Sequence, residues 1–84
     1  MYTITFQEQK QFEELLLHIL SAYNCTFKVE LDPNNNWLAC IIESEVGTVT
    51  DLHLTAPALR EILTTYEGRN DFEKALEEHL RRDC

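Results

Sequence analysis

Histidine and cysteine have the widest chemistry of the residue types in this sequence, but their spacing argues against a shared site. Each histidine falls on a different predicted element, at His18, His53 and His79. The three cysteines, Cys25, Cys40 and Cys84, form neither a CxxC motif nor a zinc-ligand spacing. Metal sites need three or four converging ligands, usually at short local spacings. We therefore expect no metal site and no cofactor.

A Cys-His-Asp nucleophilic set could be assembled from Cys25, His53 and Asp51. A catalytic cysteine needs a base within hydrogen-bond reach and an exposed, electropositive setting, and nothing in the sequence places Cys25 in one. The sequence also has no glycine-rich phosphate loop, no GxSxG motif and no HExxH motif. The prediction is a protein that is not an enzyme, with a cysteine-dependent enzyme as a minor alternative.

Acidic residues are the strongest compositional feature, since 15 acids against 7 bases give a net charge of −8. That sign argues against a direct nucleic-acid or anionic-membrane partner, because both need a positive surface. Most acids fall on helix faces or helix ends, whereas five fall in predicted strands and turns: Glu30, Asp32, Glu43, Glu45 and Asp51. If the strands bring these five together, they form a negative patch for a basic protein. The alternative is that the charge only keeps a small protein dissolved.

The stretch Trp37–Ile42 is expected to be the central strand around which the chain is arranged. Its six consecutive apolar residues leave neither face polar, so both faces should be at least partly buried. The segments 26–31 and 48–54 alternate apolar with polar residues, as half-buried neighbouring strands do. Trp37 is expected to close one end of the core, with a role as a binding anchor as the alternative.

Helical periodicity predicts a helix before this sheet and two after it. Apolar residues recur every three or four positions from Phe12 to Tyr23 and from Leu59 to Tyr66. Gly68 is expected to end the second helix, and Asn70 is expected to cap a third.

The predicted fold class is therefore α+β, as one domain over residues 1–84 in the order (β)αβββαα. The sheet is expected to be antiparallel. It has three strands, or four if residues 2–6 form a short first strand. The second face of the central strand needs a cover, which the third helix or a partner chain could supply.

The order αβββα resembles that of double-stranded-RNA-binding domains, in which the second helix begins with a basic cluster. Here the corresponding segment is Ala56-Pro57-Ala58-Leu59-Arg60 and the net charge has the opposite sign, so RNA binding is excluded. In size, acidity and element order the chain is also similar to some small phage-encoded inhibitors of nucleic-acid enzymes, anti-CRISPR proteins among them. That resemblance is an analogy that implies an inhibitor.

The leading functional hypothesis is a small acidic protein-binding module that occupies the basic nucleic-acid-binding site of a partner protein as a nucleic-acid mimic. Its expected contacts are Glu30, Asp32, Glu43, Glu45, Asp51 and Trp37. The alternative is a structural or regulatory subunit that dimerises or docks through apolar surface, using Trp37, Leu17 or the second sheet face. A cytoplasmic location with reduced cysteines is expected, since no targeting segment or apolar span is present.

Overall fold

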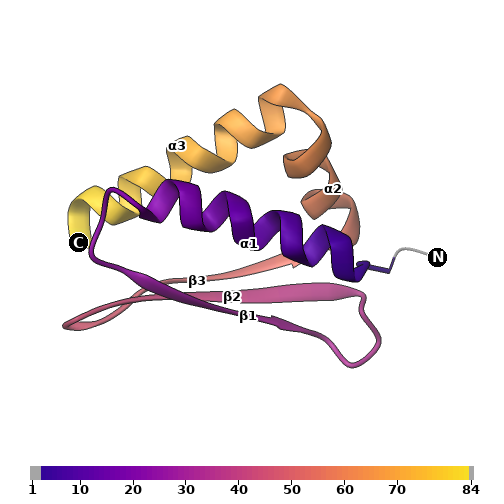
Figure 1. Ribbon diagram of the computed structural model, residues 1–84, viewed down its shortest axis with the longest axis horizontal. Coiled ribbons are helices and arrows are strands. Elements are labelled where there is room, and N and C mark those ends of the chain that lie inside the picture. Colours follow the sequence, from indigo (N-terminus) through magenta and orange to yellow (C-terminus); the bar gives the residue numbers. More distant parts are fainter. Residues whose placement is uncertain (1–2, 84) are drawn as a thin grey trace.

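A three-stranded antiparallel sheet and three helices make up the computed structural model, which describes residues 3–83 (Figure 1). The elements in chain order are α1 (Phe6–Leu20), β1 (Thr26–Leu31), β2 (Trp37–Ser44), β3 (Gly47–Thr55), α2 (Ala56–Thr64) and α3 (Tyr66–Asp83). The predicted α+β class and the order αβββαα are confirmed. The strand at 26–31 has the expected bounds, and the other two strands are one or two residues longer than expected.

The sheet has the order β1-β2-β3, so β2 is the central strand as predicted. Cys40 of β2 lies between Val29 of β1 and Leu52 of β3, and the pairing of β2 with β3 shifts by one residue between Ile42 and Glu43. Leu38, Cys40 and Ile42 of β2 are fully buried. Because successive side chains of a strand point to opposite faces, these three residues define the face that carries the core.

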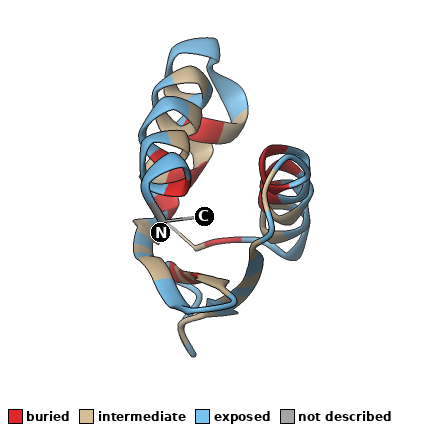
Figure 2. Cartoon of the chain, turned by 90° about the vertical axis from the view of Figure 1, so that its left-hand side faces the viewer, coloured by how far each residue is buried: buried red, intermediate tan, exposed pale blue. Residues whose placement is uncertain are grey.

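All the helices of the described chain lie on this same face of the sheet (Figures 1 and 2). Phe12 of α1 packs against Phe72 of α3 with 5.5 Å between the ring centroids, and Leu59 of α2 and Leu80 of α3 are fully buried in the same core. Of the two covers considered for the second sheet face, the third helix is therefore ruled out. α2 begins directly after β3, and only Thr65 separates α2 from α3, so the chain is too short there to pass around the sheet.

The segment before α1 is not a strand over residues 3–5, and the rest of the expected first strand lies outside the described residues or within the helix. Thr5 instead forms the predicted capping box, in which its hydroxyl accepts from the Glu8 N–H and Glu8 accepts from the Thr5 N–H. Ile4 is buried, and its N–H donates to the Asn35 carbonyl in the β1–β2 turn. Its hydrogen bond is thus made to a turn rather than to a strand.

Gly68 lies in the first turn of α3, so the expectation that it ends a helix is wrong, as is the expected cap at Asn70. α2 ends at Thr64, and Thr65 interrupts the helical backbone with φ −115° and ψ 144°. The Thr65 hydroxyl accepts from the Gly68 N–H at 3.0 Å and so satisfies the start of α3. A Cβ at position 68 would lie 2.6 Å from the Glu61 carbonyl oxygen, so glycine is needed for a close approach rather than for a turn.

Glu8 and Arg60 form an ion pair that joins α1 to α2. Arg60 Nε donates to Glu8 Oε2 at 2.7 Å, and Arg60 Nη2 donates to the Thr3 carbonyl at 2.6 Å. The hydrogen bond from Arg60 is the main reason that the pKa of Glu8 lies below its ordinary value, and burial of the carboxyl opposes that shift. The pair therefore stabilises the fold only while Glu8 is ionised.

Replacing Glu8 by glutamine should lower the free energy of unfolding at pH 7 by about 1–2 kcal/mol, because the charge-assisted hydrogen bonds are lost. The ion pair contributes fully above pH 4.5, where the carboxyl of the unfolded chain is ionised, and its contribution falls as the pH drops through the lowered pKa of the folded state. Urea unfolding of both proteins at pH 7 and at acidic pH measures this. A difference that did not shrink with acidification, or an equal loss in the exposed control E14Q, would contradict it.

Candidate protein-binding face

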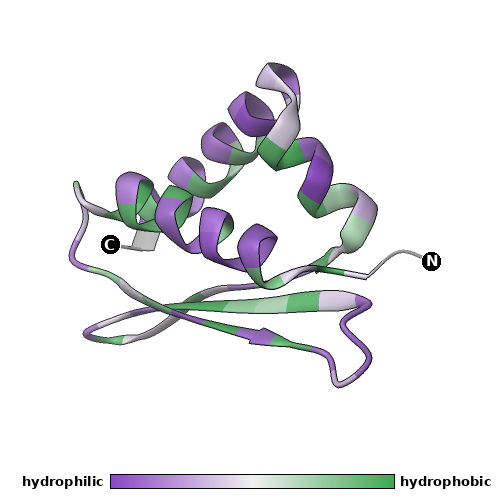
Figure 3. Ribbon diagram, turned by 45° about the vertical axis from the view of Figure 1, so that its right-hand side comes forward, coloured by the Kyte–Doolittle hydropathy of each residue, from purple (hydrophilic) through white to green (hydrophobic). Residues whose placement is uncertain are grey.

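The face of the sheet turned away from the helices is not covered by any other element within residues 3–83 (Figure 3). We call it the open face. The strand register assigns to it the side chains of Thr26, Lys28, Glu30, Trp37, Ala39, Ile41, Glu43, Asp51, His53 and Thr55. The open face is thus an uncovered surface formed by regular structure.

Apolar side chains form the middle of the open face. Trp37, Ala39 and Ile41 follow one another along β2, the central strand. Trp37 is 40% exposed, and its ring lies 5.3 Å from the His53 ring, centroid to centroid, at an angle of 48°. The expectation that Trp37 closes the core is wrong, because Leu38 takes the core side at this end of β2 and the alternation turns Trp37 away.

Polar side chains flank this apolar middle in two adjacent rows across the strands. The Ile41 row consists of Lys28, Ile41 and Asp51, and the Ala39 row consists of Glu30, Ala39 and His53. Within β3, His53 Nε2 lies 3.5 Å from Asp51 Oδ1, with both side chains more than half exposed. Each row therefore carries an acid at one edge and a basic or imidazole group at the other.

Three of the five acids expected to form a patch lie on the open face: Glu30, Glu43 and Asp51. They do not form one tight cluster. Glu43 is four residues along β2 from Ala39, the partner of Glu30, which corresponds to about 13 Å. Glu45 lies beyond it, in the turn between β2 and β3.

Asp32 lies at the opposite end of the sheet, in the turn between β1 and β2. Its Oδ2 accepts from the Asn34 N–H at 3.1 Å and from the Asn36 N–H at 3.5 Å. Asn35 in the same turn has a positive φ of 57°, which asparagine tolerates better than most residues. Asp32 thus has a structural task in this turn, as an Asx residue, and lies apart from Glu45.

The second face of the central strand, with Ala39 and Ile41, was expected to need a cover, but four other residues of the open face were not predicted as members of a site: Thr26, Lys28, His53 and Thr55. The signal that could have found them is the register of the two hairpins. Aligning the buried residues of β1, β2 and β3 puts Lys28 and Asp51 on either side of Ile41.

The nucleophilic set considered from the sequence is not brought together. Cys25 immediately precedes Thr26, which pairs with Glu43, whereas His53 pairs with Ala39. Four residues of β2 separate these two positions, or about 13 Å. Cys25 is disulfide-bonded, so the expectation of reduced cysteines is wrong for it. Disulfides are more typical of oxidising compartments, which counts against the expected cytoplasmic location.

Cys40 is fully buried on the core side of β2. Burial, with a smaller contribution from the charge of Asp51, raises the pKa of its thiol to about 12. The folded protein therefore holds Cys40 as a neutral thiol at physiological pH, and such a thiol is a poor nucleophile.

Cys40 should resist iodoacetamide at pH 8 in the native protein and react rapidly in denaturant, as measured by mass spectrometry of the peptide that contains it. Because its folded pKa is raised from 9.0, the unfolded chain loses this proton first, and stability should fall as the pH rises above 9.0. Labelling of native Cys40 at the denatured rate would contradict the burial.

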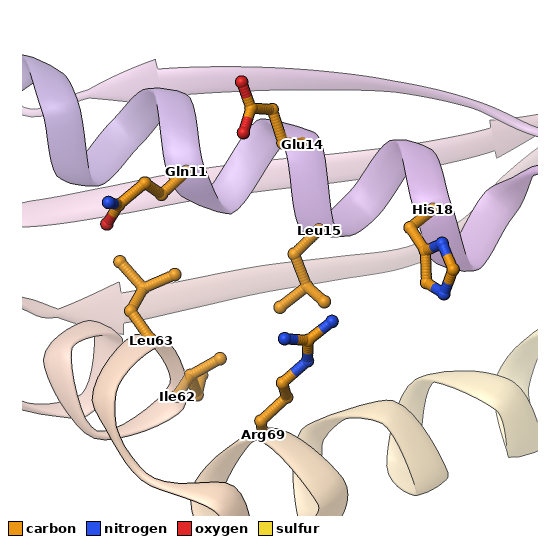
Figure 4. Close-up of a pocket in the computed structure, with 7 residues that line it drawn as sticks. All are labelled: Gln11, Glu14, Leu15, His18, Ile62, Leu63 and Arg69. Carbon is orange, nitrogen blue, oxygen red and sulfur yellow. The ribbon is translucent and has the colours of Figure 1, made fainter.

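A groove also lies on the helical side of the described chain. It has a volume of about 420 Å³ and runs between α1 and the α2–α3 pair, where Arg69 points from α3 toward α1 (Figure 4). Leu15 and Ile62 form its apolar floor, and Glu14 and His18 lie along its α1 side. Arg69 already pairs with Glu73 at 3.1 Å.

Among residues 3–83, no three or more histidine, cysteine, aspartate or glutamate side chains gather closely enough to hold a metal ion. No described helix combines the length and the apolar character needed to cross a membrane. Comparison of the chain with protein-family models, with curated proteins and with solved structures found no match.

Proposed function

We propose that this chain is a small, non-enzymatic protein-binding module that works through the open face. The observation that carries the proposal is an uncovered sheet face whose middle is apolar. Antiparallel sheets with one face on a core usually turn polar side chains outward, whereas here Trp37, Ala39 and Ile41 occupy the central strand. Tryptophan is enriched at binding hot spots, and a polar rim around an apolar centre is typical of protein interfaces.

The partner is a protein rather than a nucleic acid or a membrane, because the net charge of −8 repels both of the latter. No cofactor enters the proposal.

A pull-down from lysate, with and without nuclease treatment, tests the function when the wild-type chain is compared with I41R. The substitution places a charge in the middle of the open face and should abolish capture of a specific partner. L17R is the matched control, because Leu17 is an apolar residue of α1 that is 60% exposed on the helical side. Loss of capture in L17R with retention in I41R would move the interface to α1 and refute the proposal.

A more specific form of this function is an inhibitor that occupies the basic nucleic-acid-binding site of its partner. The observation in its favour is that Glu30, Glu43 and Asp51 share the open face, with Glu45 in the adjoining turn. Reversing the charges of Glu43 and Glu45 together should then weaken binding steeply and reduce its salt dependence. Affinity indifferent to both mutations and to salt would remove the mimic while leaving the protein-binding module.

A further inference from the structure

We propose that the open face binds a second copy of this chain, face to face, about a two-fold axis that runs across the strands. This inference rests on the proposed protein-binding function and names the partner of that surface. The pattern of charge and side-chain size on the Ile41 row and the Ala39 row carries it.

The two rows have opposite polarity. In the Ile41 row the basic residue is on β1 and the acid on β3, whereas in the Ala39 row the acid is on β1 and the imidazole on β3. The four groups therefore alternate around the apolar centre. A surface with this alternation is complementary to its own copy after a half-turn, which is the requirement for a symmetric dimer.

The proposed axis lies between the two facing sheets. It runs perpendicular to the strands and passes between the two rows. A half-turn about it places the Ile41 row of one copy over the Ala39 row of the other. β1 then faces β1 of the second copy, so Lys28 faces Glu30, and Glu30 faces Lys28. On β3, Asp51 faces His53 in the same reciprocal way. Every contact of this kind occurs twice in the dimer.

Side-chain size favours the same axis. Ile41 of each copy lies over Ala39 of the other, so a large side chain meets a small one at the centre and the two sheets can interdigitate. At the end of the strand, the indole of Trp37 lies over the carboxylate of Glu43, which can accept its N–H.

An axis parallel to the strands also pairs the edge charges with opposite charges, but it fails at the central strand. It stacks Ile41 on Ile41 and Ala39 on Ala39, which leaves a gap at the small residue. It also places Glu43 against Glu43, and directly opposed like charges are destabilising. The arrangement with antiparallel central strands is therefore the one that the surface fits.

The size of the open face implies a reversible dimer. The 8 residues of β2 span about 26 Å, and the width of three strands is about 14 Å, so each copy contributes on the order of 400 Å². That is roughly half of what each partner buries in a stable interface of standard size, which is about 800 Å². A second copy can thus be displaced by a tighter partner on the same face.

Sedimentation equilibrium of the full chain, from about 10 μM to about 1 mM, measures the dimer constant in a range suited to weak interfaces. K28E and E30K should each raise the Kd of the dimer about tenfold or more, because each creates two like-charge contacts. The double variant K28E/E30K should return close to the wild-type Kd, because the exchanged charges again face each other across the axis. About an axis parallel to the strands, the same double variant would be weaker still.

K10E is the matched control, since Lys10 is an exposed lysine of α1 on the helical side, and its Kd should equal that of the wild type. Circular dichroism checks that every variant is folded. A wild-type chain that is monomeric at about 1 mM overturns the dimer, as does a double variant weaker than both single variants. If the chain is monomeric but I41R still abolishes capture of another protein, only the dimer fails. If I41R changes neither dimerisation nor the capture of another protein, the proposed function fails as well.

Discussion

Replacing Ile42 by alanine should lower the free energy of unfolding by about 2–5 kcal/mol, whereas the same replacement at Ile41 should cost no more than about 1 kcal/mol. The two isoleucines are neighbours in β2 and are chemically identical. Ile42 is fully buried in the core, where truncation leaves a cavity that the helices cannot fill. Ile41 lies on the open face, where solvent takes the place of the lost methyl groups.

Urea unfolding followed by circular dichroism measures this pair of variants. A domain of this size has little stability to spare. I42V removes only one methylene group and should show a smaller loss of about 0.5–1.5 kcal/mol, which is measurable even where I42A is unfolded in buffer. The binding assays should give the opposite order, with I41A weakening capture or dimerisation and I42V leaving it unchanged. Equal losses of stability at Ile41 and Ile42 would mean that both faces of β2 are covered.

Replacing Gly68 by alanine should destabilise the protein by about 1–3 kcal/mol, although the same change within an ordinary helix stabilises it by about 1 kcal/mol. Gly68 belongs to the first turn of α3, so helix propensity alone predicts a gain. The added Cβ would lie 2.6 Å from the Glu61 carbonyl oxygen and 2.7 Å from the Thr65 hydroxyl oxygen. The carbonyl belongs to the backbone of α2, so the α2–α3 junction itself would have to shift.

Thermal unfolding of G68A and of A75G separates close packing from propensity. Ala75 is an exposed position of the same helix, and its change to glycine should cost about 1 kcal/mol through propensity alone. If G68A raised the melting temperature, the close approach of α2 to the start of α3 would be refuted. The helices should then separate at this junction more than the structure describes.

Local patterns predicted most of the secondary structure because they depend on the period of the side chains. Alternation in segments 26–31 and 48–54 gave the flanking strands, and the apolar run from Trp37 gave the central strand. The capping box of Thr5 and Glu8 was also confirmed, since both bonds lie within one turn of chain. Signals of this kind need no knowledge of the remainder of the fold.

The junction of α2 and α3 could not be predicted in the same way. Gly68 and Asn70 carry the usual signals of a helix end and a helix start. Thr65, three residues before Gly68, both ends α2 and caps the start of α3. Glycine at position 68 allows α2 and α3 to approach closely, and a local sequence pattern does not predict such a contact.

The candidate site was only partly predictable. The acids at Glu30, Glu43 and Asp51 were correctly singled out as strand residues, and the structure places them on one face. Asp32 and Glu45 have the same charge but lie in turns at opposite ends of the sheet. Charge and sequence position do not distinguish these cases, because a side chain's neighbours on a sheet are set by the pairing of strands.

The sequence by itself determined the α+β class, the position of the three strands and the acidic character of the chain, because composition and side-chain period act locally. Only the tertiary structure decided which face of β2 the helices cover. An apolar run such as Trp37–Ile42 has no polar side to turn outward, so its own residues do not determine which face is buried. The short connections from β3 through α2 to α3 keep the helices on the side of Leu38 and Ile42, and they leave Trp37 and Ile41 open.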